Sequence, residues 1–302
     1  MENKSQLFDL AFIGNYTKDT IVSSTGVRQV DGGGFNYGAY VAAMMGLKVA
    51  AITRLAKEDF HIVDALIQLG VEVFAHTTPE STHMRLYYPN SNPDERILSV
   101  TKTAGVFTPL QVQPVQAKAF LINASTRDEV SLEVVNALRK KDTIIVADVQ
   151  GFVRVISPDG ILKNAPWPQK REALSRVDIL KTDAVEAEML TGETDIKVAS
   201  QMLTEFGPQE IVLTHRDGLL VVAHGEFYET AFYPKKLVGR SGRGDTCIGA
   251  YTAKRLTASP AEATIWAAAV TSLKMEAEGP IRRSIAEVEE LIRKKYTVTD
   301  VN

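Results

Sequence analysis

The feature that most constrains the fold is the alternation of short apolar runs with helix-period segments through the middle of the chain. Apolar runs at residues 120–123, 143–147, 177–180 and 211–214 are separated by segments whose apolar residues recur at helical spacing. Each run has the length of a strand and is apolar enough to be buried on both faces, which is typical of parallel sheets covered by helices. We therefore predict an α/β chain with a mostly parallel central sheet flanked by helices.

The ends of the chain extend this pattern. Strands are predicted at residues 7–13 and 49–53, where apolar side chains again cluster. Residues 219–231 are predicted to form an antiparallel edge late in the sheet, and residues 245–296 contain three successive helical patterns.

Two segments interrupt the alternation. Residues 15–31 and 71–106 carry short β-prone stretches separated by turn residues, without helical spacing. We predict that they form a small β-sheet lid inserted into one domain that spans residues 1–302. Neither a flexible linker nor an internal repeat divides the sequence.

Charge and cysteine content exclude several classes of protein. Lys and Arg number 34 against 37 Asp and Glu, and this net charge of −3 predicts no general attraction to nucleic acid or to anionic membranes. The one cysteine, Cys247, has no partner for an internal disulfide, which favours a reducing compartment. The polar start does not resemble a signal peptide, and no apolar run has bilayer-spanning length. We expect a cytoplasmic protein.

Several familiar motifs are incomplete. The glycine run at Gly32-Gly33-Gly34 does not match the dinucleotide-binding fingerprint, because Tyr37 stands where the third glycine of that fingerprint belongs. A nicotinamide-linked oxidoreductase is therefore remote. There is no Walker A lysine loop, and the five histidines lack the spacing of metal ligands.

The glycine-rich loop at residues 239–245 is the most informative motif. It leads directly into a helical pattern, so its backbone N–H groups and the helix dipole form a cradle for an anion. Asp245 lies at this cradle, where a carboxylate would repel a bound phosphate. Two interpretations stay open: Asp245 takes a proton from an attacking hydroxyl beside a phosphoryl group, or it caps the helix.

This loop and four other motifs, taken in order, resemble those of the ribokinase-like (PfkB-type) kinases of sugars, nucleosides and polyols. The motifs are Gly14 to Asp19, Gly32-Gly33 with the helix that follows, Asp183-Ala184-Val185-Glu186, Thr214 to Gly218, and Gly242-Arg243-Gly244-Asp245. The similarity covers almost the whole chain. It implies a three-layer ribokinase-like α/β fold with a β-sheet lid, and an ATP-dependent kinase that uses Mg²⁺.

The resemblance also implies roles for individual residues. Asp245 matches the family's catalytic base, and the amides of Gly242, Arg243 and Gly244 match its anion hole. The implied donor-binding residues are Asp183, Glu186, Thr214, Gly218, Gly242 and Gly244, with Glu186 holding Mg²⁺ through water or phosphate. The implied substrate-binding residues are Asp19, Gly33, Asn36, Tyr37, Gln150 and Arg154.

Within the family, the sequence is most similar to the myo-inositol kinase branch. Gly14-Asn15-Tyr16, Tyr37 after the glycine pair, and Asp148-Val149-Gln150 with Arg154 carry this similarity. It implies that a small polyol, myo-inositol or a similar cyclitol, accepts the phosphoryl group. A sugar or nucleoside kinase of the same family is the alternative, and a non-catalytic binding protein on this fold is a further one.

The sequence also departs from the family. Gly239 and Arg240 stand where members usually have Asp and Thr. Because that Asp helps to form a monovalent-cation site in some members, dependence on a monovalent cation is doubtful here. Arg243 replaces an Ala and Asp183 replaces an Asn. Exposed lid strands are compatible with a monomer or with a homodimer through the lid.

Three further features have two interpretations each. Arg154 either clamps a phosphate, with Asp148 holding it, or forms a structural ion pair. The charged run Asp94-Glu95-Arg96 on the lid either is a solvated turn, which is the default, or contacts substrate. For Cys247, a small buried hydrophobic residue is favoured over a reactive thiol.

Overall fold

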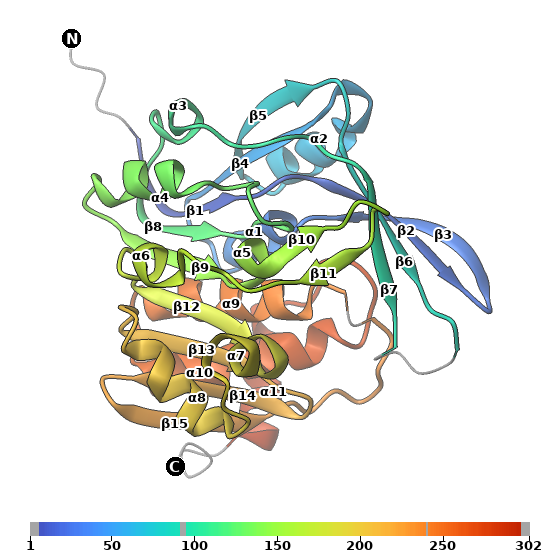
Figure 1. Ribbon diagram of the computed structural model, residues 1–302. Coiled ribbons are helices and arrows are strands. Elements are labelled where there is room, and N and C mark those ends of the chain that lie inside the picture. The colour runs from blue at the N-terminus through green and yellow to red at the C-terminus, as the bar shows by residue number, and fades with distance from the viewer. Residues whose placement is uncertain (1–5, 91–94, 240, 297–302) are drawn as a thin grey trace.

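The computed structural model describes residues 6–90, 95–239 and 241–296. A nine-stranded sheet forms its centre (Figure 1). In spatial order its strands are β15 (Glu226–Ala231), β14 (Gly218–Ala223), β13 (Glu210–Thr214), β12 (Ile179–Asp183), β9 (Ile144–Asp148), β8 (Gln116–Ile122), β1 (Leu7–Ile13), β4 (Val49–Ala56) and β5 (Glu72–Thr78). Neighbours from β13 to β5 pair in parallel, and β14 and β15 form the antiparallel edge. The predicted mostly parallel sheet is confirmed.

Helices cover both faces of this sheet, and each face has its own hydrophobic core. One core includes residues of α1 (Gly34–Met44), α2 (His61–Gln68), α9 (Arg243–Arg255), α10 (Pro260–Lys274) and α11 (Ile285–Lys295). The other includes residues of α3 (Pro109–Val112), α4 (Leu132–Arg139), α6 (Lys170–Leu174), α7 (Ala184–Thr191) and α8 (Ile196–Thr204). The result is the expected three-layer arrangement. Within the described ranges, no helix has both the length and the apolar character needed to cross a bilayer.

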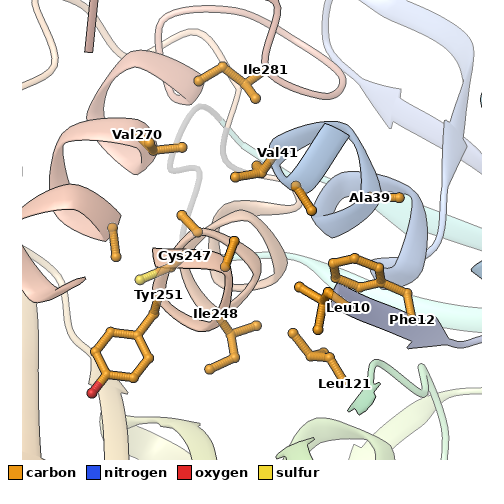
Figure 2. Packing of buried hydrophobic residues seen from close by; sticks show 14 of the residues in the cluster. Leu10, Phe12, Ala39, Val41, Leu121, Cys247, Ile248, Tyr251, Val270 and Ile281 are labelled. Atoms are coloured by element: carbon orange, nitrogen blue, oxygen red, sulfur yellow. The ribbon is translucent and has the colours of Figure 1, made fainter. Parts of the chain in front are cut away.

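Helix α9 is the central element of the first core. Figure 2 shows Cys247, Ile248 and Tyr251 on this helix, pointing into the packing between α1, α10 and the sheet. A Cβ atom on Gly249 would lie 2.8 Å from the Cα atom of Gly38 on α1, so two glycines let these helix backbones touch. Cys247 is fully buried, and burial raises the pKa of its thiol to about 11, which fits a small hydrophobic residue.

A separate four-stranded sheet forms the lid and extends from one side of the body (Figure 1). Its strands, in spatial order, are β3 (Gly26–Gly32), β2 (Thr17–Ser23), β6 (Thr82–Tyr87) and β7 (Ile97–Lys102). The antiparallel pair β2–β3 and the antiparallel pair β6–β7 meet through parallel pairing of β2 with β6. All four strands come from the two predicted segments, except that β3 extends one residue beyond the first, to Gly32.

Two details of the lid differ from the prediction. The predicted second segment, residues 71–106, begins too early, because β5 pairs with β4 as the edge of the large sheet. Residues 61–78 are one helix followed by one strand, which completes a parallel crossover from β4. In addition, the short hairpin of β10 (Arg154–Ile156) and β11 (Leu162–Asn164) reaches the lid, through a bridge between Ser99 and Ile161.

Candidate active site

Parallel strands place their carboxyl ends at one edge of a sheet, and polar residues stand at this edge here. Asn123 follows β8, Asp148 ends β9, Asp183 ends β12 and Thr214 ends β13. Ligands of open α/β sheets bind at this edge. A cavity of about 240 Å³ lies there, between the strand ends, the lid and the first turn of α9. Asp245 lines this cavity from α9.

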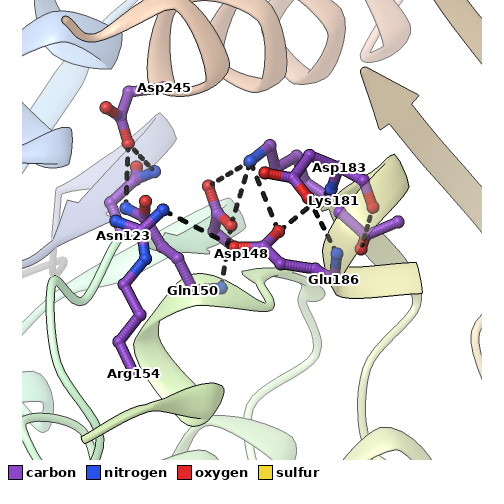
Figure 3. Close-up of polar contacts among 9 residues, drawn as sticks. Asn123, Asp148, Gln150, Arg154, Lys181, Asp183, Glu186 and Asp245 are labelled. Carbon is purple, nitrogen blue, oxygen red and sulfur yellow. Dashed lines mark hydrogen bonds and ion pairs between the residues drawn. The ribbon is translucent and has the colours of Figure 1, made fainter. Parts of the chain in front are cut away.

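The Asp245 carboxylate points toward two side-chain amides at the sheet edge (Figure 3). Its Oδ1 accepts a hydrogen bond from Asn123 Nδ2 at 3.4 Å and another from Gln150 Nε2 at 3.3 Å. Burial raises the pKa of Asp245, and the positive charges of Lys181 and Arg154 oppose this rise. The carboxylate is therefore a stronger base than an exposed aspartate, and nearby cations favour its ionised form.

The glycine run at the start of α1, Gly32-Gly33-Gly34, makes room for two carboxylates. A Cβ atom on Gly34 would lie 2.5 Å from Asp245 Oδ1, and one on Gly32 would lie 2.6 Å from Asp19 Oδ2. Gly33 has a φ of +96°, a backbone conformation that residues other than glycine rarely adopt. The motif is thus needed to bring an acid from the lid strand and an acid from α9 close to one cavity.

The loop at the start of α9 is equally crowded. Gly242 precedes the helix with φ of +73°, and a Cβ atom there would collide with the Tyr37 ring. A Cβ atom on Gly244 would lie 2.8 Å from Lys181 Nζ. Gly242, Arg243 and Gly244 all line the cavity, at the end of α9 where free N–H groups and the helix dipole favour an anion.

Lys181 is a site residue that the sequence analysis missed. It lies on β12, 4% exposed, and its ammonium is 3.3 Å from the carboxylate of Asp148 and 4.0 Å from that of Glu186. Burial alone would lower the pKa of Lys181, but the surrounding carboxylates outweigh it and the net shift is upward. Lys181 therefore stays charged, and it lines the cavity beside Gly244.

Asp183 and Glu186 form a capping box at the start of α7. The Asp183 side chain accepts from the Glu186 amide at 2.8 Å, and the Glu186 side chain accepts from the Asp183 amide at 3.0 Å. Asp183 lines the cavity, whereas Glu186 is 1% exposed and does not. Burial raises the pKa of Glu186 to about 7.

These carboxylates limit how magnesium would be held. In the part of the chain that the structure describes, no three His, Cys, Asp or Glu side chains are grouped to bind a metal ion. Oε1 of Glu186 is buried and has no hydrogen-bond partner among the described residues. In the cavity lining, Asp183 would be the acid that reaches a hydrated magnesium ion through water, and the magnesium role of Glu186 stays a prediction.

The opposite end of the cavity faces the lid. Asp19 on β2 has a buried Oδ1 with no hydrogen-bond partner among the described residues, and burial raises the pKa of its carboxyl to about 7. Gln150 and Arg154, at the ends of the short helix α5 (Gln150–Val153), line the cavity on this side. Arg154 lies 3.6 Å from Glu186, while Asp148 pairs with Lys181, so the expected holding of Arg154 by Asp148 is wrong.

The cavity gathers most of the residues expected at the site. The expected residues that line it are Asp19, Gly33, Tyr37, Gln150, Arg154, Asp183, Thr214, Gly242, Arg243, Gly244 and Asp245. Three expected residues do not line it: Asn36, Glu186 and Gly218. Asn36 is fully buried within α1, and Gly218 begins β14, where a Cβ atom would collide with the Thr230 carbonyl of β15. The glycine at 218 thus serves strand pairing.

Lys181 and Asn123 each stand at a position that the sequence itself marks as unusual. Lys181 comes directly after the predicted strand at residues 177–180, and Asn123 is the polar last residue of the run at residues 120–123. A buried charge or a polar residue at the end of a parallel strand points to the binding edge. Arg96 lines the cavity from the lid, in favour of its substrate-contact interpretation, while Asp94 of the same charged run lies outside the described residues.

Comparison with known proteins is consistent with this arrangement. A model of the pfkB family carbohydrate kinases matches residues 8–286. A cytidine kinase of Thermococcus kodakarensis is 27% identical over 267 residues, which cover 85% of this chain and 91% of that protein.

Solved structures give closer similarity. A pyrophosphate-dependent kinase of the ribokinase family, complexed with a pyrophosphate analogue and myo-inositol, is 34% identical with a TM-score of 0.86, covering 93% of this chain and 99% of that one. A pyrophosphate-dependent myo-inositol-1 kinase, converted into a myo-inositol-3 kinase by two substitutions to leucine, is 33% identical with a TM-score of 0.85, covering 95% and 100%. Ribokinase of Arabidopsis thaliana, with ribose and ATP, shares the fold at 20% identity and a TM-score of 0.76, covering 95% and 99%.

Proposed function

This chain belongs to the pfkB family of carbohydrate kinases, and from that premise we propose that it transfers a phosphoryl group to a hydroxyl of myo-inositol or a similar cyclitol. One observation carries the proposal. A single cavity holds the Asp245 carboxylate between an anion-binding end, formed by Gly242–Gly244 and Lys181, and a lid-facing end with Asp19 and Gln150. A base placed between a phosphate site and a polyol site is what phosphoryl transfer to an alcohol requires.

In the proposed reaction, the acceptor hydroxyl lies beside Asp245 and the donor's terminal phosphoryl group lies at the start of α9. Asp245 accepts the hydroxyl proton as the oxygen attacks the terminal phosphorus in line, and the bond from that phosphorus to the bridging oxygen breaks, so that the rest of the donor leaves as a phosphate anion. The amides of Gly242, Arg243 and Gly244, together with the Lys181 ammonium, stabilise the negative charge of the transferring group. Magnesium, held through water near Asp183, would neutralise charge on the donor's phosphates. Closure of the lid would exclude water from the reaction.

The donor that we propose is inorganic pyrophosphate, in place of the ATP expected from the sequence. At the donor end the cavity is lined by Lys181, Asp183, Thr214, Arg243 and Gly244, and none of these described residues has an apolar side chain. Cations and hydroxyls suit a small polyanion, whereas a purine ring is usually bound by apolar surfaces. The two kinases at 33–34% identity described above, both pyrophosphate-dependent, support this choice. ATP is the alternative donor.

The acceptor end combines hydrogen-bonding groups with an apolar wall. Asp19 and Gln150 offer a carboxylate and an amide to a polyol's hydroxyls, while Met84, Leu86 and Leu98 line the cavity from the lid. Leucine side chains cannot bond a hydroxyl, so they favour ring orientations that turn carbon-bound hydrogens toward them. In the related inositol-1 kinase, two substitutions to leucine change the hydroxyl that is phosphorylated. We propose that Leu86 and Leu98 select the hydroxyl that faces Asp245.

The test is a matrix of donors and acceptors. Pyrophosphate and ATP, each with Mg²⁺, are combined with myo-inositol, other cyclitols, ribose, hexoses, cytidine and other nucleosides, and product is followed by ³¹P NMR. The expected result is phosphorylated myo-inositol from pyrophosphate. Turnover with ATP alone would contradict the donor, and turnover confined to a sugar or nucleoside would contradict the acceptor.

Absence of turnover with every pair, while pyrophosphate still binds, would favour a non-catalytic binding protein on this fold. The cytidine kinase at 27% identity makes cytidine the most informative nucleoside in the panel. A cytoplasmic location, and a monomer or a homodimer through the lid, stay predictions. Sedimentation velocity at several concentrations tests the oligomeric state.

A further inference from the structure

Lys274, the last residue of α10, is a buried cation on the far side of the glycine-rich loop. It is 1% exposed, and its ammonium donates a hydrogen bond to the Gly239 carbonyl at 3.1 Å and another to the Ser241 carbonyl. Ser241 is the residue before Gly242, so the ammonium is fixed to the backbone that leads into the anion site. Lys274 does not line the cavity that contains Asp245.

The surroundings of this ammonium resemble those of a bound cation. Its Nζ lies 5.5 Å from the centre of the Tyr37 ring, within the range of a cation–π contact. Asp245 and Glu278 attract its charge, and Arg243 repels it. Burial lowers the pKa of Lys274 to about 8 despite the two acids. Burial opposes this charge, yet the ammonium stays here, and its removal would leave two part-buried carbonyls without this donor.

The Lys274 contact also sets the direction of an amide of the anion site. The Ser241 carbonyl and the Gly242 N–H belong to one peptide unit, and in a trans peptide these two groups point in opposite directions. A Ser241 carbonyl held toward Lys274 therefore turns the Gly242 N–H away from Lys274. Gly242 lines the active-site cavity and Lys274 does not, so a Gly242 N–H that is turned away from Lys274 is available to a phosphate in that cavity.

We propose that Lys274 is a built-in monovalent cation: its ammonium occupies a carbonyl site beside the anion loop, residues 241–244, and holds the loop in its phosphate-binding conformation. Lys274 is thus a positioning residue that acts through the loop. The sequence made dependence on a monovalent cation doubtful. The contacts of Lys274 give a physical reason why the activity would not require one. This inference rests on the proposed phosphoryl transfer.

A second cavity makes the proposal testable by chemical rescue. It has a volume of about 360 Å³ and is lined by Lys274, Gly239, Ser241 and Tyr37, among others. A truncated side chain at position 274 would open the carbonyl site to this cavity. Potassium, ammonium or methylammonium could then enter the space, whereas tetramethylammonium is too large and has no N–H group to donate.

The first measurement is made on the wild-type protein. Initial rates with saturating pyrophosphate and myo-inositol are compared in the chloride salts of potassium, sodium and tetramethylammonium at equal ionic strength. The expected rates agree within about twofold, because the tethered ammonium already fills the site. A tenfold activation by potassium over tetramethylammonium would overturn the proposal.

The second measurement uses two variants. Lys274→Ala is expected to lower kcat by about 10²-fold in tetramethylammonium chloride, the usual loss for a misplaced anion-hole donor, with the acceptor KM within about threefold. Ammonium, methylammonium or potassium should raise the rate of Lys274→Ala at least about fivefold, because a cation bound to the Ser241 carbonyl would again direct the Gly242 N–H toward the phosphate. Lys274→Met should show the same loss of kcat. Added cations should not restore its rate, because the methionine side chain fills the space that they would enter.

The matched control is Lys254→Met. Lys254 also has its ammonium 5.0 Å from an aromatic ring, that of Trp266, but it lies near the other end of α9. This control should keep wild-type kinetics. Full activity of Lys274→Ala in tetramethylammonium chloride, or a loss that no small cation reverses, would overturn the proposal.

Calorimetric titration with pyrophosphate, without acceptor, separates this inference from the proposed function. We expect the wild type to bind pyrophosphate, and Lys274→Ala to bind it at least about tenfold more weakly unless ammonium is present. This result would support the role of Lys274 in positioning the anion loop even if no acceptor is phosphorylated. Equal binding by the wild type and both variants would overturn it. If neither variant folds, the cation comparison on the wild type decides.

Discussion

At the scale of single residues, the reaction depends on the protonation of Asp245. Replacing it by asparagine keeps the shape of the side chain and removes the base. We expect Asp245→Asn to lower kcat by about 10²–10⁴-fold, the usual size of a general-base effect, with pyrophosphate affinity nearly unchanged. Steady-state kinetics and calorimetric binding measure the two quantities.

The control for this substitution is Asp217→Asn. Asp217 is exposed in the turn between β13 and β14, outside the cavity lining. The kcat of the Asp217→Asn variant should match that of the wild type. An Asp245→Asn variant within about threefold of wild type would contradict the base assignment.

Asp19 predicts the pH dependence of acceptor binding. Burial raises the pKa of its carboxyl to about 7, and proximity to Asp245 adds to the rise. A carboxyl whose pKa is raised becomes protonated as the pH falls through that value, and it then loses its capacity as a pure acceptor for hydroxyl groups. We expect kcat/KM for the acceptor to fall below about pH 7.

The pH profile of Asp19→Asn tests this. The asparagine does not titrate, so the part of the acid limb due to Asp19 should disappear, leaving the limb set by Asp245. If the profiles of the wild type and the variant have the same shape, Asp19 does not control acceptor binding through its charge.

At the scale of elements, the lid strands β6 and β7 present leucines to a polar cavity. The double variant Leu86→Asn with Leu98→Ser would place hydrogen-bonding groups on that wall and change the favoured orientation of the ring. We expect a different inositol hydroxyl to be phosphorylated, with kcat within about tenfold of wild type because Asp245 and the anion loop are untouched. Chiral chromatography and NMR of the product identify the position.

The control is Leu110→Asn, since Leu110 is 75% exposed on α3 and away from the cavity. It should give the wild-type product. The same product from the double variant would contradict the role of the leucine wall.

The contact between α1 and α9 predicts a loss of stability. The helices touch at Gly38 and Gly249, where a Cβ atom on Gly249 has Gly38 Cα only 2.8 Å away. We expect Gly249→Ala to reduce the free energy of unfolding by about 1–3 kcal/mol through overpacking, measured by urea denaturation. A loss under about 0.5 kcal/mol would show that the helices separate easily. Since α9 carries Asp245, a fall in kcat should accompany the loss of stability.

At the scale of the whole molecule, a polar contact joins the lid to the body. Arg28 on β3 pairs with Glu278 in the loop after α10, and both side chains are nearly half exposed. Exposed ion pairs contribute at most about 1 kcal/mol, so this pair can bias lid closure without locking it. We expect Arg28→Ala to raise the acceptor KM by less than about fivefold and to leave kcat within about twofold.

Ionic strength provides a second readout of this contact. The acceptor KM of the wild type should rise modestly with added salt, and that of Arg28→Ala should not, because salt screens exposed charges. A large loss of kcat in Arg28→Ala would mean that the pair does more than bias the lid.

Local patterns in the sequence determined the α/β class, the parallel sheet and the loop at residues 239–245, because strand, helix and glycine-loop signals depend on neighbouring residues. The same patterns placed Asp245 at an anion cradle. They misplaced β5, since a strand signal does not say which sheet the strand joins. The family resemblance implied Asn36 and Gly218. Strand pairing accounts for the glycine at 218, whereas the amide of Asn36 is buried without a hydrogen-bond partner among the described residues.

The tertiary structure alone decided the partners of the site's charges. Asn123 meets Asp245 across 122 residues, and Lys274 meets the Ser241 carbonyl across 33. Such contacts depend on which strand ends and helix ends lie side by side, and that order is set by packing of the whole sheet and its two helical layers. A sequence pattern can name a catalytic acid, but the burial and the cations that tune its pKa come from residues that only the folded chain brings to it.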